Sequence, residues 1–250
     1  MNETLRLLYE RKSVRDYSAK QITQEEKRAI FEAAIQAPTA GNMTLYTILD
    51  ITNQDIKERL AVTCDNQPFI AKAPLVLIFC ADYRRWINVF EKYDTDVRVP
   101  EEGDMLLAQA DAIIAAQSAV MAAESMGIGS CYIGDIIENF EIHKELLALP
   151  KYVVPACMVC FGYPTKQQET RQKPARFAIE AIVHENGYRI EKADATAMEE
   201  MLNRRQSDWG QDSLPEWVKR FCKRKWNSEF SVEMSRSARE MIKAWCEEKK

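Results

Sequence analysis

Two clusters of basic residues are the features of this sequence that could do chemistry. The first is the segment RKSVR at residues 11–15, which places three cations and a hydroxyl group within five positions. The second consists of Arg171, Lys173 and Arg176, in a loop that also contains proline. Because arginine and lysine side chains complement phosphate oxygens, the two clusters could converge on one phosphate group. From the spacing alone, solvated surface charge is the more frequent explanation of such clusters.

The common nucleotide-binding and hydrolase motifs are missing from the sequence. There is no G-x-x-x-x-G-K-[ST] phosphate loop, and the glycines of residues 127–134 (GIGSCYIG) do not form the G-x-G-x-x-G pattern that opens a helix. No G-x-S-x-G nucleophile elbow occurs, and the sequence contains only two histidines, His143 and His184. A P-loop, a Rossmann fingerprint and a Ser-His-Asp triad are therefore disfavoured.

The seven cysteines indicate free thiols rather than disulfides or a metal site. Their number is odd and several lie in apolar runs, which favours buried thiols in a reducing compartment, the cytoplasm. Cys157 and Cys160 form a C-x-x-C pair, but residues 153–161 are predicted to be a buried strand, in which positions three apart point to opposite faces. A redox or zinc function is therefore disfavoured, and we expect no metal.

The composition predicts a soluble globular protein that binds neither membrane nor nucleic acid. The 250 residues are 46% hydrophobic and 29% charged, with a net charge of -4, and the charged N-terminus lacks the apolar region of a signal peptide. The long apolar stretch at residues 105–126 is interrupted by polar side chains that are costly in lipid, so we expect a buried helix. The basic run at residues 219–226 could contact nucleic acid, but the flanking Glu216 and Glu229 favour a solvated helix.

Strands and helices alternate along the first 188 residues, which predicts an α/β or α+β domain of three layers. We expect strands at residues 45–51, 75–80, 130–133, 153–161 and 181–184. We expect helices at residues 4–10, 24–37, 54–63, 84–93, 104–126 and 138–147. The rest of the chain is predicted to form helices near residues 194–205, 215–225 and 231–247. Because this tail shows little apolar periodicity, we interpret it as an arm that wraps the body or a partner subunit.

Several short motifs occur in an order that resembles the nitroreductase family. RKSVRDY at residues 11–17 is similar to the family signature, R-R-S-x-R-x-F/Y. The other motifs are APTAGNM (37–43), AAESMGIGSCYIG (122–134), CFGYP (160–164), R-x-K-P-x-R-F (171–177), IVHENGY (182–188) and FCKRKWNSEFSVEMSRS (221–237). The last resembles the extended C-terminal arm of the branch that contains the larger NAD(P)H flavin reductases and oxygen-insensitive nitroreductases. Each motif alone is modest, but their order is specific.

The resemblance implies an α+β fold of three layers, in which helices pack a central mixed sheet, in an obligate homodimer with exchanged C-terminal arms. It implies an FMN-binding core at residues 1–188 and a helical arm at residues 189–250. It also implies FMN sites at the subunit interface and ping-pong transfer of hydride from NADPH or NADH, through flavin N5, to small acceptors such as nitroaromatics, quinones or flavins. Two alternatives stay open. One is a related flavoenzyme with a dedicated substrate, such as a dehalogenase, with a lid at residues 82–103; the other is a non-enzymatic flavin-binding protein.

On the phosphate side of the flavin, the resemblance implies contacts from both basic clusters. Arg11, Lys12 and Ser13 would contact the phosphate and the ribityl chain, and Lys173 and Arg176 would return to the phosphate. The sequence departs from the family in two ways here. Many relatives have His-Arg at the first two positions of the first cluster, and many have K-P-R where this chain has KPAR at residues 173–176. The inserted alanine leaves the reach of Arg176 undetermined.

On the ring side, the resemblance implies contacts from three further segments and from the partner subunit. Arg15 would lie near the N1/O2 edge, where a fixed cation would stabilise negative charge on the reduced flavin. Gln67 would hydrogen-bond the pyrimidine edge, in a stretch with Pro68 and Phe69, and Thr39 would come from the other subunit. The ring near N5 would be lined, largely through backbone atoms, by Tyr132, Ile133, Gly134 and Asp135. A glycine there permits the close approach that a backbone N–H at N5 requires, and no catalytic side chain is needed.

Overall fold

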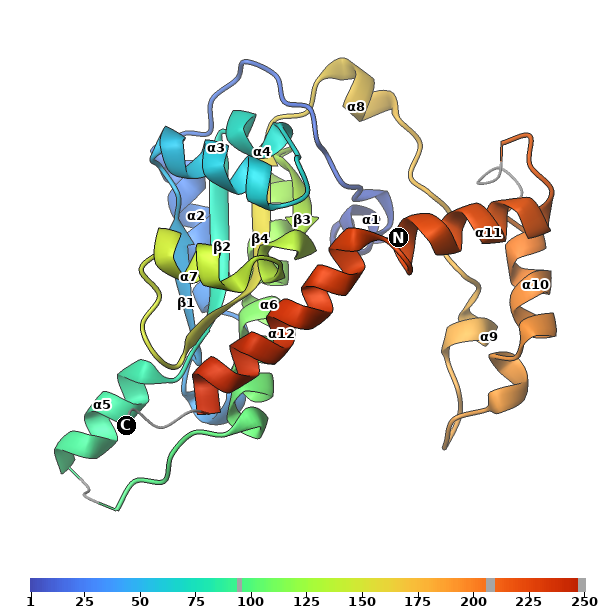
Figure 1. Ribbon diagram of the computed structural model, residues 1–250. Coiled ribbons are helices and arrows are strands. Elements are labelled where there is room, and N and C mark those ends of the chain that lie inside the picture. Colours follow the sequence, from blue (N-terminus) through green and yellow to red (C-terminus); the bar gives the residue numbers. More distant parts are fainter. Residues whose placement is uncertain (94–95, 206–209, 247–250) are drawn as a thin grey trace. The chain divides into compact units, whose positions relative to one another are not determined.

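The computed structural model describes residues 1–93, 96–205 and 210–246 of the chain (Figure 1). The chain divides into two compact units. The first unit consists of Met1–Arg171 together with the segment from Val232 to the C-terminus, and the second unit consists of Gln172–Ser231. The predicted division into a core of residues 1–188 and an arm of residues 189–250 stays a prediction.

A four-stranded sheet forms the centre of the first unit. In sheet order, its strands are β1 (Tyr46–Asp50), β2 (Leu75–Asp82), β4 (Val153–Gly162) and β3 (Gly129–Ile133). All neighbouring strands run antiparallel, and the parallel pairing seen in the described residues is an isolated bridge between Ser13 and Ser130. The α+β class is confirmed. The sheet that we expected to be mixed is antiparallel in all four strands. The sequence did not reveal the strand direction, because a connection that contains a helix can join antiparallel strands as well as parallel ones.

The two central strands, β2 and β4, are buried along their whole length, as their continuous apolar runs predicted. On β4, Cys157 packs into the core beneath the alanine-rich helix, whereas Cys160 packs into the core on the other face of the sheet. The prediction that these thiols lie on opposite faces is confirmed. Burial raises the pKa of both thiols, which keeps them in the unreactive protonated form.

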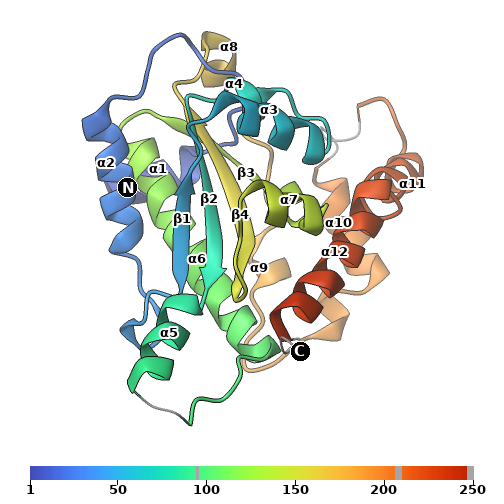
Figure 2. The same cartoon turned by 60° about the vertical axis from the view of Figure 1, so that its left-hand side comes forward.

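One face of the sheet is covered by α6 (Glu102–Ser125) and α2 (Gln24–Ile35), as Figure 2 shows. Six alanines of α6 are fully buried, and their small side chains let the helix lie close to the sheet. Gly127, two residues past the end of the helix, has a φ of 75° that suits glycine, and the chain there makes the backbone hydrogen bonds of a Schellman cap. The length and apolar composition of α6 would suffice to cross a membrane, but the helix is a core element that buries Asp111 along with its alanines.

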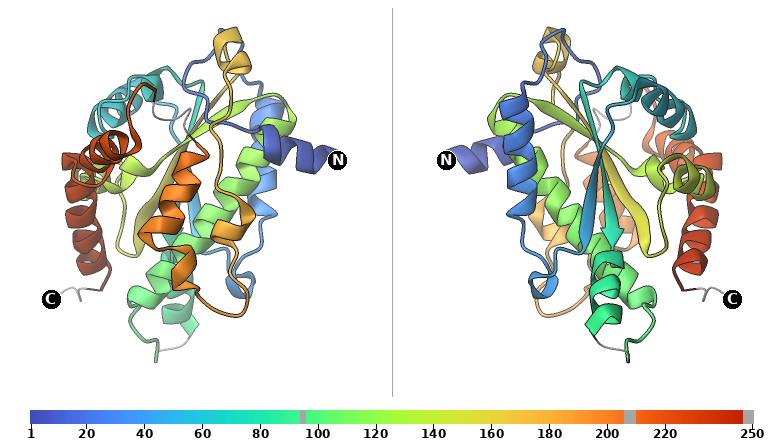
Figure 3. Two further views of the ribbon diagram at one scale, coloured as in Figure 1. Left: turned by 90° about the vertical axis from the view of Figure 1, so that its right-hand side faces the viewer. Right: turned by 90° about the vertical axis from the view of Figure 1, so that its left-hand side faces the viewer.

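The other face of the sheet is covered by α3 (Gln54–Thr63), α4 (Phe69–Lys72) and α7 (Phe140–Leu146), which gives the three predicted layers (Figures 2 and 3). The helix α7 begins two residues later than predicted, because Asn139 adopts a left-handed backbone with a φ of 48°. The other elements of this unit are α1 (Glu3–Glu10), η1 (Ala40–Asn42), α5 (Arg84–Tyr93), η2 (Gly134–Ile137) and α8 (Lys166–Thr170).

The last helix, α12 (Glu229–Cys246), belongs from Val232 onward to the first unit and packs against α7 of its own chain. The Ser237 hydroxyl accepts the backbone N–H of Phe140 at 3.1 Å. Trp245 is 1% exposed and meets two tyrosine rings edge to face. The final helix of the predicted arm therefore completes the core of the chain that carries it.

The second unit contains α9 (Ile179–Ile182), η3 (Ile190–Lys192), α10 (Ala195–Asn203) and α11 (Leu214–Lys225). The helices predicted near residues 194–205 and 215–225 are confirmed. The strand predicted at residues 181–184 is wrong, because the chain there closes a single helical turn in which the Val183 N–H donates to the Ile179 carbonyl at 2.8 Å. The β-branched side chains suggested a strand, but the described part of this unit offers no strand for pairing.

Asp111 fastens the loop that follows α2 to the central helix. Its carboxylate is 3% exposed and accepts hydrogen bonds from the Thr39 hydroxyl and from two backbone N–H groups. These groups belong to Ala40, at 3.0 Å, and Leu45, at 3.3 Å. A carboxylate can satisfy several donors because it offers two oxygens with four lone-pair sites. Asp111 therefore fixes the loop that carries Thr39 against α6.

Replacing Asp111 by alanine should destabilise the protein by about 2–4 kcal/mol, because three donors would lose their acceptor inside the protein. Asp111→Asn keeps one acceptor oxygen and should cost roughly half as much. Urea unfolding followed by circular dichroism measures both effects. Asp55→Ala, which removes an exposed carboxylate from the first turn of α3, is the control and should cost less than about 1 kcal/mol. Equal stability of Asp111→Ala and this control would contradict the fastening role.

Candidate functional site

The basic segment at residues 11–15 lies along the free edge of the sheet, beside β3. Ser13 and Ser130 form a parallel bridge, and the Val14 N–H donates to the Ser130 carbonyl at 2.9 Å. Gly129 makes this approach possible, because a Cβ atom there would lie 2.5 Å from Cγ2 of Val14. The packing of Val14 on a glycine therefore determines where the neighbouring cations lie.

Arg11 and Tyr132 face each other at one end of this edge. The Arg11 guanidinium lies 5.8 Å from the centre of the Tyr132 ring, and its Nη2 lies 3.4 Å from Ser130 Oγ. Its Nε is buried and has no hydrogen-bond partner among the described residues. The Tyr132 hydroxyl donates to Gln117 on α6 at 3.2 Å, which holds the ring in place. Arg11 thus brings a positive charge with an unused donor to the edge of the sheet.

Lys12 ties the basic segment to α8. Its ammonium group donates to the carbonyls of Glu169 and Arg171, at 2.6 Å each. The Arg171 guanidinium donates in return to the Ser13 carbonyl, so one member of the second basic cluster meets the first cluster. Two of the three ammonium hydrogens of Lys12 are used in this way, which leaves one for a ligand.

Lys173 and Arg176 belong to the second unit, and the structure does not place them against residues 11–15. Arg176 Nη1 donates to the Pro174 carbonyl, within its own loop, at 3.0 Å. The contact that we predicted between these two side chains and a phosphate stays a prediction, and so does the effect of Ala175 on their reach.

Arg15 lies near the middle of the edge, next to Cys131. Its side chain and the Ser13 hydroxyl lie within hydrogen-bond reach of the Cys131 thiol, whose pKa is raised by burial. Arg15 itself is exposed, and its backbone N–H lies 3.5 Å from Gln168 Oε1. A cation therefore borders the strand at a point that a ligand can reach.

Gln67 and Asp135, which we expected to contact the flavin separately, form a hydrogen bond with each other. The Gln67 amide nitrogen lies 2.9 Å from Asp135 Oδ2 and 2.9 Å from the Cys64 carbonyl oxygen. Because both neighbours are acceptors, the nitrogen must face them, and the amide oxygen points elsewhere. Gly134, directly before Asp135, is exposed, and a Cβ there would meet no atom within 4 Å. This end of β3 therefore presents an amide carbonyl beside open backbone.

The remaining predicted residues support the edge more than they face it. Pro68 occupies the N-cap position of α4, and Phe69 is half-buried against the core beneath α3. Ile133 is 1% exposed, so only its backbone can meet a ligand, as we expected for this segment. The Thr39 hydroxyl donates to Asp111, and its contact with the flavin of a partner subunit stays a prediction.

Groups suited to both ends of an elongated ligand therefore lie along one edge of the sheet. From Ser130 to Asp135 the chain can span at most about 18 Å. Arg11 lies at the first end, the Gln67 carbonyl lies at the second, and Arg15 lies between them. Such an edge can bind a ligand that carries an anionic group at one end and a polar heterocycle at the other.

Known proteins with similar sequences show what kind of protein carries this edge. Residues 8–163 match the profile of the nitroreductase family. The chain belongs to this family. It is 33% identical over 188 residues to the oxygen-insensitive NADPH nitroreductase of Salmonella typhimurium, which covers 75% of each chain. It is 32% identical over 196 residues to an FMN reductase (NADPH) of Bacillus subtilis, which covers 78% of each chain. With the NADPH-flavin oxidoreductase of Vibrio harveyi it shares 30% identity over 222 residues, or 85% of this chain and 90% of the relative.

Solved structures of the family share the fold. Nitroreductase A from Vibrio parahaemolyticus aligns with a TM-score of 0.78 and 26% identity, over 97% of this chain and 98% of that one. The NADPH:FMN oxidoreductase of Vibrio harveyi, solved in complex with NAD+, aligns with a TM-score of 0.76 and 25% identity, over 96% and 98% of the two chains. The family resemblance of the sequence motifs is confirmed, and with it the branch of larger flavin reductases.

Two buried acids that neighbour predicted site residues were not among the residues that the sequence singled out. Asp111 carried a signal, since a carboxylate in an alanine-rich apolar stretch needs buried donors. Glu138 carried none, because it lies in a turn between two elements. It is 4% exposed, and burial, followed by the neighbouring Asp135 carboxyl, raises the pKa of Glu138 to about 8. Such a shift beside a candidate ligand site makes Glu138 a candidate functional residue.

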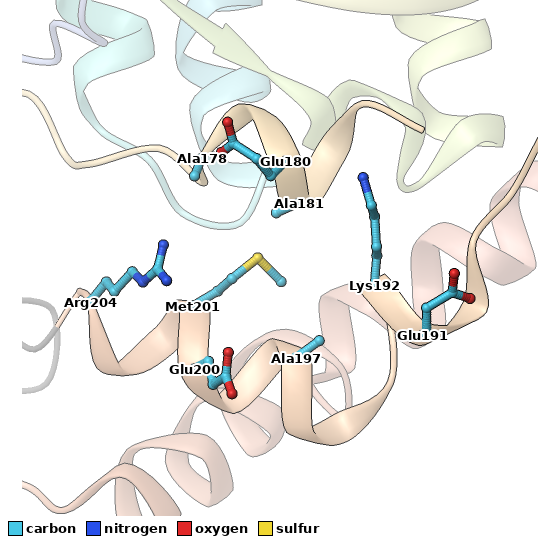
Figure 4. Close-up of a pocket in the computed structure, with 9 residues that line it drawn as sticks. All are labelled: Ala178, Glu180, Ala181, Glu191, Lys192, Ala197, Glu200, Met201 and Arg204. Atoms are coloured by element: carbon cyan, nitrogen blue, oxygen red, sulfur yellow. The ribbon is translucent and has the colours of Figure 1, made fainter. Parts of the chain in front are cut away.

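A pocket of about 380 Å³ lies within the second unit, between α9, η3 and α10. Figure 4 shows Met201 of α10 pointing toward α9, and Arg204 lies just beyond the end of α10. The Lys192 ammonium donates to the Val183 carbonyl at 3.2 Å, so it caps the end of α9. Three glutamates also line the pocket and offset its two cations, and none of the predicted FMN-binding residues lies in its lining. The pocket therefore gives no support to an anion site.

Gly129→Ala should destabilise the protein by about 1–3 kcal/mol, because the new Cβ would displace Val14 from β3. Gly103→Ala is the control. A Cβ at this position in the first turn of α6 meets nothing within 4 Å, so the substitution should be neutral or stabilise by less than about 1 kcal/mol. Urea unfolding measures both variants. If the two substitutions had the same effect, the close packing of Val14 on Gly129 would be wrong.

Proposed function

We propose that the protein is an FMN-dependent oxidoreductase that transfers hydride from NADPH or NADH to nitroaromatic, quinone or flavin acceptors in a ping-pong sequence. The observation that carries this proposal is the edge of β3, where cations lie beside Ser130 and Cys131 and an amide carbonyl lies beside Asp135. The names of the relatives, which include an NADPH nitroreductase, an FMN reductase and an NADPH-flavin oxidoreductase, support the same cofactor, donor and acceptors.

The residues along this edge fit FMN. The buried Arg11 Nε lacks an acceptor in the described part of the chain, and phosphate oxygens are the acceptors that arginine pairs with most readily. Lys12 and Ser13 would hold the phosphate and the ribityl chain with it, and the second basic cluster would add to the phosphate site. The outward carbonyl of Gln67 is an acceptor suited to an N–H of the pyrimidine ring.

Bound FMN would supply the hydride chemistry, because its ring can accept hydride from a nicotinamide and pass it to a second substrate at the same open face. The residues of this chain bind and orient. Arg15 holds a fixed positive charge beside β3, which stabilises negative charge on a nearby ring oxygen. Gly134 leaves room for its backbone to approach a ligand closely, and Tyr132 and Asp135 would contact the ligand from positions on either side of it. The reaction therefore needs no nucleophile from the protein.

We further propose that the protein works as a homodimer in the cytoplasm. Leu106 and Ile113 lie seven residues apart on one side of α6 and are 62% and 47% exposed in the single chain. Leu107 and Ile114 repeat this pattern beside them. An exposed apolar helix face suits a second copy of the chain, whose Thr39 would then reach the flavin. The five buried free cysteines fit a reducing compartment.

Flavin content and turnover test the proposed activity together. The purified protein should be yellow, NADPH or NADH should bleach it under anaerobic conditions, and a nitroaromatic or quinone should restore the colour. Stopped-flow measurements with each nicotinamide separately give the donor preference. A yellow protein that oxidised neither nicotinamide with any acceptor would be a flavin-binding protein, and turnover restricted to one substrate would indicate a dedicated flavoenzyme.

Arg15→Ala should weaken FMN binding about tenfold or more and slow bleaching by NADPH, because a charge-assisted interaction of about 1.5–3 kcal/mol is lost. Fluorescence titration measures the affinity, and stopped-flow absorbance measures the rate. Arg28→Ala, which removes an exposed arginine of α2 paired with Glu32, should leave both unchanged. Unaltered affinity and rate in Arg15→Ala would show that this arginine does not serve the flavin.

Two glutamates on the exposed face of α6 should disrupt the homodimer. Leu106→Glu combined with Ile113→Glu places carboxylates in the proposed interface, where they would lose water without gaining partners. Sedimentation velocity should therefore report a monomer, with loss of bound FMN. Val62→Glu, on an equally exposed position of α3, is the control and should remain a dimer. A monomeric wild-type protein, or a dimer that survived the double substitution, would contradict the interface.

A further inference from the structure

Glu138, Asp135 and Gln67 form a connected line of polar side chains just beyond the end of β3. We propose that a protonated Glu138 donates a hydrogen bond to Asp135, and that this pair locks the Gln67 amide with its carbonyl oxygen turned toward a ring N–H of the ligand. Glu138 is then a positioning residue, since it acts on the ligand through its two neighbours. The inference rests on the proposed binding of FMN, whose pyrimidine ring carries such an N–H.

The orientation of the Gln67 amide is fixed from two sides. Each hydrogen of its NH₂ group has an acceptor at 2.9 Å, one on Asp135 and one on the Cys64 carbonyl. The amide oxygen has no donor among the residues that the structure describes. The turn that carries Gln67 contains two consecutive residues with left-handed backbone, Asp65 (φ 59°) and Asn66 (φ 49°), which leaves it few alternative conformations. The amide can rotate only if Asp135 releases it.

Asp135 holds the amide most firmly when Glu138 is protonated. The Glu138 carboxyl lies within hydrogen-bond reach of Asp135, and its backbone N–H donates to the Asp135 carbonyl at 3.0 Å. Its Oε1 is buried and has no partner within the described chain. Two carboxylates in contact disfavour each other's ionisation, and here the buried one, Glu138, also lacks water to solvate its charge. A neutral Glu138 donates a hydrogen bond from its O–H to Asp135 and leaves only a carbonyl oxygen unpaired, which is far less costly than a buried unpaired anion.

The other groups that face Glu138 favour the same protonation. Asp65 and Glu233 are acidic neighbours of Glu138. Arg236, the cation nearest in sequence to Glu233, is already paired with Glu233 at 2.8 Å. His143 is fully buried, and burial lowers its pKa, so it stays neutral. Burial first, and then the acidic neighbours, raise the pKa of Glu138 to about 8. The proton is therefore present at neutral pH and lost in mild alkali.

Loss of this proton should free the Gln67 amide to rotate and should lower the affinity for the ligand. Above about pH 8 two anions would stand in contact, and Asp135 would move away from Glu138 and release Gln67. Folding stability should follow the same group. Its pKa is raised on folding, so the free energy of unfolding falls as the pH rises from about 4.5 to about 8 and is level above that.

The test compares the affinity for FMN of the wild-type protein, Glu138→Gln and Glu138→Ala. The glutamine side chain donates to Asp135 at every pH, as the protonated acid does, whereas alanine donates at none. We expect the affinity of the wild type for FMN to fall roughly tenfold, relative to that of Glu138→Gln, between about pH 6.5 and about pH 9.5. The affinity of Glu138→Ala should be lower than that of Glu138→Gln by a similar factor at every pH. Glu25→Gln, at an exposed position of α2, is the matched control and should follow the wild type.

Flavin fluorescence measures these affinities, and the ratio between proteins at one pH removes the ionisation of free FMN. Thermal unfolding gives a second readout, since the midpoint should fall with rising pH more steeply in the wild type than in Glu138→Gln. Equal alkaline weakening of Glu138→Gln and the wild type, or full affinity of Glu138→Ala, would overturn the inference alone. Absence of FMN binding by the wild type would overturn the proposed function and this inference with it.

Discussion

The contact between Val14 and Gly129 is the constraint on which the candidate site depends. An edge strand such as β3 leaves backbone N–H and C=O groups open to pairing with other chains, and the bridge at Ser13 covers part of that edge. The same contact carries cations to the strand, because Arg11 and Arg15 flank the residues that pack there. A side chain at position 129 would separate the two backbones and move both charges. The absence of a side chain at Gly129 therefore determines where the cations of the candidate site lie.

The central helix α6 meets a different environment on each of its faces, and its residue types differ accordingly. Toward the sheet it needs small side chains, which the buried alanines supply. Toward the loop after α2 it needs an acceptor for three donors, which Asp111 supplies. Toward solvent it carries exposed leucines and isoleucines, which a monomer does not need. The core, the Thr39 loop and the proposed dimer interface therefore share one helix.

The elements of the fold could be predicted because their signals are local. Burial of β2 and β4 could be predicted from their apolar runs, and burial of α6 from its alanines. Strand direction and the turn at residues 181–184 could not be predicted, because both depend on which partner strands lie nearby. In the site, the family motifs identified the segments that meet at β3. The bond between Gln67 and Asp135 could not be foreseen, since it joins two turns that lie 68 residues apart.

The two buried acids near the site show why burial alone does not determine what a carboxyl group does. Asp111 receives one hydroxyl and two backbone N–H groups, so it serves as a fixed acceptor that holds a loop. Glu138 receives no such donors in the described chain and faces other acids, so burial favours its protonated form and turns it into a donor. The difference comes from how many donors the surrounding turns direct at each carboxyl. The opposite electrostatic roles of the two acids are thus set by backbone conformation, which neither residue type reveals in the sequence.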